Sequence, residues 1–153
     1  MLHTYSTIVV GTDGSPLATP TVARAATIAA NENARLVIVC SYTSMPRRAD
    51  AKNTNTLGGD PKIDQVPDQA EARRAVESAV TQAQDAGANV TAALILDADA
   101  TSALLHTVEE RGAELLVIGA IRDRSIAGRL LGTVAKQVTQ RATCDVLIVR
   151  PVD

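Results

Sequence analysis

Hydrophobic residues in this chain gather in five short runs, at residues 6–12, 36–42, 90–96, 114–119 and 145–150. Most of these runs are continuously apolar and do not alternate between apolar and polar residues. A continuous apolar run of this length is typical of a strand that is covered on both faces, as in a parallel sheet. The pattern therefore predicts five strands, most of them buried.

Between the runs, apolar residues recur at the spacing of an amphipathic helix. The first stripe consists of Ala18, Val22, Ala25, Ala26 and Ala29, which share one face at 3.6 residues per turn. Similar stripes cover residues 72–83, 100–108 and 134–142. The second helix has Asp68 as its expected N-cap, Glu71 as a capping-box acid and Gly87 as its C-cap, and the third closes at Gly112.

Strands and helices thus alternate along the chain, which favours a parallel sheet with helices on both faces. We expect one doubly wound, Rossmann-like α/β domain over residues 1–153, with five parallel strands in the order 3-2-1-4-5. Residues 43–67 hold three prolines and the pair Gly58-Gly59 without periodicity, so we expect a flexible loop there.

The last strand, residues 145–150, would lie at an edge of this sheet with nothing left in the chain to cover it. An exposed apolar edge favours pairing with a second copy, so we predict a homodimer through this strand. The alternative is an edge protected by its short length and by Pro151.

Composition narrows the possible functions. The chain is 46% hydrophobic with a formal net charge of −2, and it has two tyrosines but no phenylalanine or tryptophan. These values argue against nucleic-acid binding and against recognition by aromatic stacking. The first ten residues do not have the pattern of a secretory signal, and no apolar run is long enough to span a membrane. Cys40 and Cys144 form no metal-binding spacing. We therefore expect a cytoplasmic protein without membrane contact.

In an open parallel sheet, ligands bind beyond the carboxyl ends of the strands, where the strand order reverses. Here that crevice lies between strands 1 and 4. Strand 1 is followed by Gly11-Thr12-Asp13-Gly14-Ser15-Pro16. Asp13 is a candidate acceptor for a ligand hydroxyl or amino group; alternatively, Asp13 or Ser15 caps the next helix, with Pro16 in its first turn.

The segment after strand 4 starts at Gly119 and enters a helix at Gly132-Thr133. Backbone N–H groups at a helix start, with a glycine that permits close approach, form an anion site suited to phosphate. Arg122, Arg124 and Arg129 add positive charge between these points. The alternative is a glycine-containing loop whose arginines are solvated.

Four segments of the chain, VVGTDGS, LLVIGA, GRLLGTVAKQV and CDVLIVRP, resemble the universal stress protein family, and the resemblance covers nearly the whole length. It implies an adenine nucleotide alpha hydrolase-like fold and dimerisation through the last strand. The ATP-binding branch carries Gly, two residues, Gly, nine residues, then Gly followed by Ser or Thr. Gly119 and Gly132-Thr133 match this motif, but Arg122 replaces its second glycine. Ala98-Asp99-Ala100 replaces a Gly-Asp-Pro-like turn.

The resemblance implies a regulatory ligand, ATP or another adenine nucleotide such as AMP or cAMP, with Mg²⁺ as an optional companion ion. Gly11, Thr12 and Asp13 would lie at the adenine or ribose end, and the backbone near Ser41 would read the adenine edge. Gly119, Arg122, Gly132 and Thr133 would surround the ribose and phosphates. We expect no enzymatic role beyond slow incidental hydrolysis. The alternative is a nucleotide-free dimeric stress module whose pocket is disabled by Arg122 and Ala98.

Overall fold

A five-stranded parallel sheet forms the centre of the computed structural model, which describes residues 4–43, 68–120 and 131–151. The strands are β1 (Thr7–Gly11), β2 (Arg35–Tyr42), β3 (Asn89–Asp97), β4 (Leu115–Gly119) and β5 (Asp145–Val149). Their order in the sheet is β3-β2-β1-β4-β5, and every neighbouring pair is parallel. The predicted fold and strand order are confirmed.

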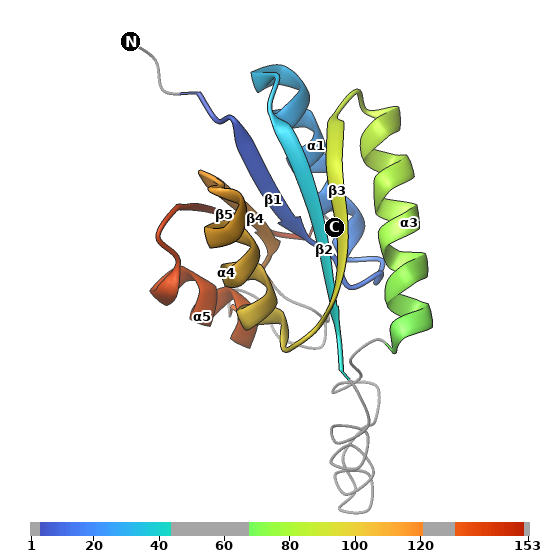
Figure 1. The fold of residues 1–153 in the computed structure, drawn as a ribbon, viewed down its shortest axis with the longest axis vertical. Coiled ribbons are helices and arrows are strands. Elements are labelled where there is room, and N and C mark those ends of the chain that lie inside the picture. The colour runs from blue at the N-terminus through green and yellow to red at the C-terminus, as the bar shows by residue number, and fades with distance from the viewer. Residues whose placement is uncertain (1–3, 44–67, 121–130, 152–153) are drawn as a thin grey trace, which may run out of the picture.

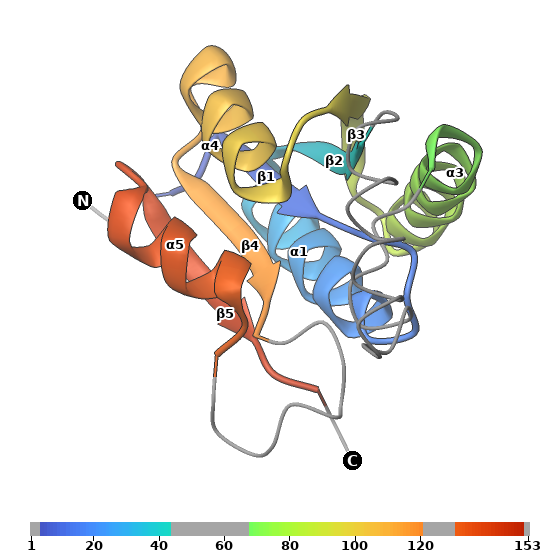
Figure 2. The same cartoon turned by 90° about the horizontal axis from the view of Figure 1, so that it is seen from below.

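Helices cover both faces of the sheet (Figure 1). The helices are α1 (Ala18–Glu32), α3 (Gln69–Asp85), α4 (Ala100–Arg111) and α5 (Thr133–Arg141). Helices α1 and α3 pack on one face, whereas α4 and α5 pack on the other (Figure 2). The predicted loop at 43–67 lies, apart from residue 43, outside the described residues, as does the segment 121–130.

Strand β1 shows how the two faces are filled. Its side chains alternate, so that Ile8 and Val10 join the core beneath α1 and α3 while Val9 joins the core beneath α4 and α5. All three are fully buried. The buried positions of α3 are almost all alanine (Ala72, Ala75, Val76, Ala79 and Ala83). Small side chains let a helix lie close to its neighbours, and this packing needs no aromatic residue.

Most helix ends follow the sequence signals. The Asp68 carboxylate accepts a hydrogen bond from the Glu71 N–H at 2.8 Å and caps α3. Gly112 ends α4 in the left-handed conformation at φ 62°. The start of α1 differs from the prediction, because this helix begins at Ala18 with Leu17 as an N-cap that makes no side-chain hydrogen bond. Neither Asp13 nor Ser15 caps it, so that interpretation was wrong.

The amino ends of the strands are connected by side chains. The Glu114 carboxylate, just before β4, accepts hydrogen bonds from the backbone N–H groups of Ser6 at 2.7 Å and Thr7 at 3.0 Å. The Tyr5 hydroxyl donates to the carboxylate of Asp145, the first residue of β5, at 2.8 Å. These contacts join the starts of β1, β4 and β5. We call this region the amino edge of the sheet.

The two outermost strands differ from the central ones in burial. The apolar residues of β1, β2 and β4 are almost all buried, whereas β3 and β5 keep most of theirs only half-buried. An outermost strand lacks a neighbour on one side, which accounts for this difference. Within the described residues, no helix combines the length and the apolarity that crossing a membrane requires.

Candidate functional site

The carboxyl ends of the strands meet at the opposite edge of the sheet, which we call the carboxyl edge and which Figure 2 views from below. Seven of the eight predicted site residues lie here. Gly11 and Gly119 end β1 and β4, Thr12 and Asp13 follow β1, and Ser41 is the last residue but one of β2. Gly132 is the N-cap of α5 and Thr133 its first residue. Arg122 lies outside the described residues.

The turn after β1 is held by its own side chains. The Thr12 N–H donates to the Val39 carbonyl at 2.9 Å and so continues the pairing of β1 with β2. The Thr12 hydroxyl accepts from the Gly14 N–H at 3.2 Å, and the Asp13 Oδ1 accepts from the Ser15 N–H at 2.8 Å. Two consecutive side-chain-to-backbone bonds fix the conformation of this turn.

Two glycines in this segment are close to other elements. A Cβ atom added at Gly11 would lie 3.0 Å from Cδ2 of Leu104 in α4. One added at Gly14 would lie 2.8 Å from Cβ of Ala75 in α3, and Gly14 also has a φ of 79°. Any other residue at Gly14 would therefore meet both a steric and a conformational penalty. The turn after β1 is thus placed directly against α3.

The β4 side of the edge ends in a helix start. The Gly132 N–H donates to the Ala120 carbonyl at 2.8 Å, which holds the beginning of α5 beside the end of β4. Gly132 has φ −66° and ψ 166° and makes no side-chain cap. Since Thr133 is exposed, the first turn of α5 presents backbone N–H groups and a hydroxyl, a combination suited to an anion.

A groove lies on the other side of β1, between α1 and α3, with a volume of about 300 Å³. One wall comes from Thr12–Ser15 and from Ala18, Thr19 and Val22 of α1. The opposite wall comes from α3, including Glu71, Arg74 and Ser78. The Gln82 side-chain amide donates to the Thr19 carbonyl at 2.9 Å and thereby joins the two helices within the groove. We call this feature the α1–α3 groove.

The sequence did not predict this groove. Its only early signals were the small residues on the inner faces of the first two helices, Ala18 and Val22 on one and Ala79 on the other. Nothing in the spacing of these residues indicates that the two helices stand side by side. The predicted crevice lay between strands 1 and 4, whereas the groove extends to the β2 side of β1 and shares with the crevice only Thr12–Ser15 of the turn after β1.

The His, Cys and acidic side chains of the described residues were the candidates for metal binding or thiol chemistry. Within ranges 4–43, 68–120 and 131–151, no three His, Cys, Asp or Glu side chains come together as a metal site. His106 is mostly exposed and its Nε2 lies 2.9 Å from Glu110 on the next turn of α4. Burial raises the pKa of the Cys144 thiol above its ordinary value, which makes this cysteine a poor nucleophile.

Strand order, helix placement and the position of the turns define a doubly wound, Rossmann-like α/β protein with its candidate site at the carboxyl edge. The model of the universal stress protein family matches residues 4–150. Universal stress protein Rv1636 of Mycobacterium tuberculosis is 39% identical over 149 residues, which are 97% of this chain and 98% of that protein. The chain belongs to the universal stress protein family.

Solved structures of the family share the fold. A universal stress protein crystallised in complex with cAMP is 33% identical with a TM-score of 0.73, over 98% of this chain and 100% of that one. A universal stress protein from Archaeoglobus fulgidus is 27% identical with a TM-score of 0.70, over 94% of this chain and 98% of that one. The resemblance inferred from the four sequence segments is confirmed.

Proposed function

We propose that this universal stress protein binds an adenine nucleotide at the carboxyl edge of its sheet and that the nucleotide is a regulatory ligand. The observation that carries the proposal is the likeness, over the whole chain, to a relative at 33% identity that was crystallised with cAMP. The edge of this chain offers a compatible set of groups. Its turn after β1 is fixed by its own hydrogen bonds, and the helix start after β4 presents N–H groups.

Each part of the nucleotide then has its own binding group. Asp13 accepts hydrogen bonds from the ribose, and the backbone near Ser41 meets the base. Gly119 allows close approach, while Gly132 and Thr133 bind phosphate through the positive end of the α5 dipole. Arg122 replaces the second motif glycine. Its guanidinium is suited to a phosphate, so the substitution changes the phosphate subsite without removing it.

We further propose that the protein acts by binding and not by catalysis. Asp13 already uses its Oδ1 on the Ser15 N–H, which makes it a positioning group for a ligand more than a general base. Any Mg²⁺ at the site would arrive with the nucleotide. Hydrolysis of ATP is therefore expected to be slow and incidental.

The experiment is calorimetry or thermal shift with ATP, AMP and cAMP, each with and without Mg²⁺. A ligand that binds only the folded state raises the melting temperature, by the equivalent of about 2.7 kcal/mol at one hundred times Kd. Absence of any response at millimolar ligand would overturn the proposal and favour the nucleotide-free module. The Arg122→Gly variant separates two roles of Arg122: binding weakens if the guanidinium holds phosphate and strengthens if it obstructs the pocket.

We also propose that two copies associate through β5. This strand lies at the edge of the sheet, and its Val146, Leu147 and Ile148 are half-buried in the single chain. Pairing with a second β5 would cover these residues and satisfy the open backbone edge. Light scattering at micromolar concentration should give twice the 16.0 kDa mass of the chain. A monomeric mass would refute this part of the proposal.

A further inference from the structure

Strand β3 forms the second open edge of the sheet, at the end opposite β5. It is nine residues long, whereas β5 has five. From Asn89 to Leu96 it contains no charged residue and no proline, the residues that commonly keep natural edge strands from pairing. Within the part of the chain that the structure describes, no strand pairs with its outer side. This edge is therefore suited to accept a further strand.

The backbone of β3 presents hydrogen-bonding groups on its open side. The Ala98 N–H, just past the end of the strand, donates to the Tyr42 carbonyl of β2 at 3.1 Å. In a parallel pair, every second residue of a strand bonds to the neighbouring strand, and the residues between them turn their backbone groups the other way. Counting back from Ala98, the backbone groups of Ala93 and Ile95 point away from β2. They are free to bond to another strand.

A bulge limits the regular part of this edge. Leu36 of β2 pairs with Val90, but the next residue, Val37, pairs with Ala92, so that Thr91 is an extra residue in β3. A bulge bends its strand and interrupts pairing. Regular pairing on the open side therefore begins at Ala92 and continues toward the end of the strand.

The side chains of this regular part are apolar and change in size along it. Ala92, Leu94 and Leu96 join the core beneath α4 and α5 but remain half-buried, because α4 packs on β1 and β2. On the other face, Ile95 contacts the core beneath α3, and Ala93 is exposed. The segment thus begins with small residues and ends with large ones. Two copies of such a segment, placed antiparallel, put small residues opposite large ones.

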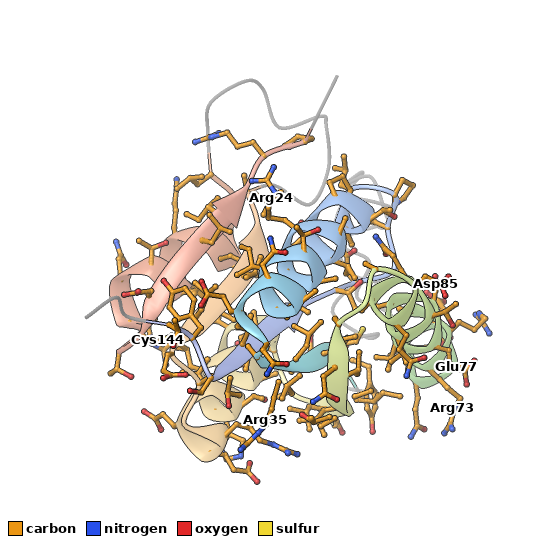
Figure 3. All side chains as sticks on the ribbon, turned by 90° about the horizontal axis from the view of Figure 1, so that it is seen from above. Arg24, Arg35, Arg73, Glu77, Asp85 and Cys144 are labelled. Atoms are coloured by element: carbon orange, nitrogen blue, oxygen red, sulfur yellow. The ribbon has the colours of Figure 1, made fainter. Side chains whose placement is uncertain are left out.

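Helix α3 has a position that fits a second copy beside β3. It packs on both β2 and β3, so its axis runs near the line between them. Strands in a sheet are about 4.8 Å apart, so a symmetric copy would bring a second α3 to about 10 Å, the spacing of packed helices. Figure 3 shows Arg73 and Glu77 on the side of α3 that faces away from α1. This side carries both signs of charge, and half-buried Val80 lies one turn further along it.

We propose that the open edge of β3 is an interface for a second copy of this chain, with the two β3 strands antiparallel about a two-fold axis at Leu94. Leu94 then lies opposite Leu94 of the second copy. Ala92 lies opposite Leu96, and Ala93 lies opposite Ile95. The pair of Ala93 and Ile95 exchanges backbone hydrogen bonds, whereas the Leu94 pair at the axis is a non-hydrogen-bonded pair. A second copy supplies both an uncharged strand of complementary size and a helix at packing distance.

This interface is separate from the proposed nucleotide site and from β5, which lies at the other end of the sheet. Copies that pair through β5 would therefore keep their β3 edges available, and β3 pairing would join such dimers into larger assemblies. The paired segment is short, so we expect this association to be weaker than that of an obligate dimer. A covalent trap is the suitable test for it.

The first test is disulfide formation at the two-fold axis. Cα atoms of a non-hydrogen-bonded antiparallel pair lie about 4.5 Å apart, within the range that a disulfide spans. Under mild oxidation, Leu94→Cys should therefore run at twice the 16.0 kDa mass of the chain on a non-reducing denaturing gel. The control is Thr91→Cys, which is exposed but would lie about 20 Å from its own copy in this register. It should remain a single chain. Both variants also carry Cys144→Ala, which removes the less buried native thiol.

A second pair of variants tests the edge itself. Ala93→Lys, added to Leu94→Cys, places like charges near the axis and should prevent the disulfide. Asn89→Lys adds the same charge to the same strand outside the paired segment and should leave the disulfide unchanged. Both positions are exposed. Circular dichroism and the melting temperature show whether each variant is folded.

The outcomes separate this inference from the proposed function. Equal linking of Leu94→Cys and Thr91→Cys, or no linking of either, overturns the assignment of a second copy and leaves the edge to a strand of another protein. Linking that survives Ala93→Lys overturns it as well. Ala93→Lys should bind cAMP like the wild type, since the interface and the nucleotide site are separate. Failure of nucleotide binding would therefore leave the β3 interface standing, and loss of the interface would leave the nucleotide site standing.

Discussion

At the amino edge of the sheet, polar side chains join the strands to one another, whereas at the carboxyl edge they line an open groove. Glu114 receives two backbone N–H groups from the segment that precedes and begins β1, and Tyr5 is bonded to the first residue of β5. After β1, the Thr12 and Asp13 side chains accept hydrogen bonds from the Gly14 and Ser15 N–H groups of the same turn. They leave the space between α1 and α3 unfilled.

The two ends of β1 are therefore held in different ways. The amino end of β1 is held by long-range contacts, so changes there act on the stability of the whole sheet. At its carboxyl end the link to β2 is made by backbone groups, the Thr12 N–H and the Val39 carbonyl, while the Thr12 and Asp13 side chains bond to backbone groups of the turn. These side chains can therefore change without unlinking the strands. The comparison predicts that variants at the amino edge alter stability and leave ligand affinity unchanged, and that variants at the carboxyl edge mainly do the reverse.

Gly14→Val is the variant with the largest expected effect, and it is the exception to this rule. Valine at φ 79° is strained, and its Cβ would lie 2.8 Å from Cβ of Ala75. We expect a loss of about 3 kcal/mol in the free energy of unfolding, measured by urea denaturation, together with loss of adenosine binding.

The control is Gly112→Ala at the amino edge, where φ is 62° but nothing lies within 4 Å of an added Cβ. Only the conformational penalty remains there, about 1 kcal/mol. Equal losses in the two variants would show that contact between the turn and α3 is unimportant.

Glu114→Ala tests the amino edge and ranks second. It leaves the N–H groups of Ser6 and Thr7 without their carboxylate partner, and we expect a loss of about 2 kcal/mol in urea denaturation. Glu114→Gln keeps an acceptor oxygen and should lose less. Affinity for cAMP should stay at the wild-type value in both variants; a fall in affinity would contradict the division between the two edges.

Asp13→Ala tests the carboxyl edge and has a smaller effect on stability. It removes the hydrogen bond to the Ser15 N–H from a half-buried turn, and that bond is worth about 1 kcal/mol. Affinity for cAMP should fall by about tenfold, because the ribose loses its acceptor. Calorimetry alongside urea denaturation separates the two effects. A loss of stability without loss of affinity would assign Asp13 a purely structural role.

The difference between short-range and long-range contacts also explains which features the sequence could predict. Helix positions follow from local patterns, such as the alanine stripe of α1 and the caps at Asp68 and Gly112, and the strand order follows from the general rule for parallel crossovers. These predictions are confirmed. The alternative in which Asp13 or Ser15 caps α1 was wrong, because Asp13 bonds within the preceding turn and the Leu17 N-cap makes no side-chain hydrogen bond. An Asp or Ser that caps a helix and one that bonds within a turn have the same sequence signature.

Local sequence patterns could not predict the α1–α3 groove or the amino-edge contacts, because these features join distant parts of the chain. The contact between Gly14 and Ala75 joins residues far apart in the chain, and so does the pair of Tyr5 and Asp145. Their proximity depends on how α3 and β5 pack against the sheet. A single sequence carries no local signal for that packing, so these features appear only in the folded chain.

Tyr5→Phe has the smallest expected effect, and its pH dependence is its signature. The hydrogen bond that the hydroxyl donates to Asp145, together with burial and the nearby carboxylate charge, raises the pKa of Tyr5 above its ordinary value of 10.0. The folded state thus favours the protonated phenol. This contribution is fully present below pH 10 and is lost as the pH rises through the folded-state pKa. In melting scans from pH 8 upward, the wild type should therefore lose stability faster than Tyr5→Phe above about pH 10. Parallel pH profiles for the wild type and Tyr5→Phe would show that the contact between Tyr5 and Asp145 does not help to hold the amino edge together.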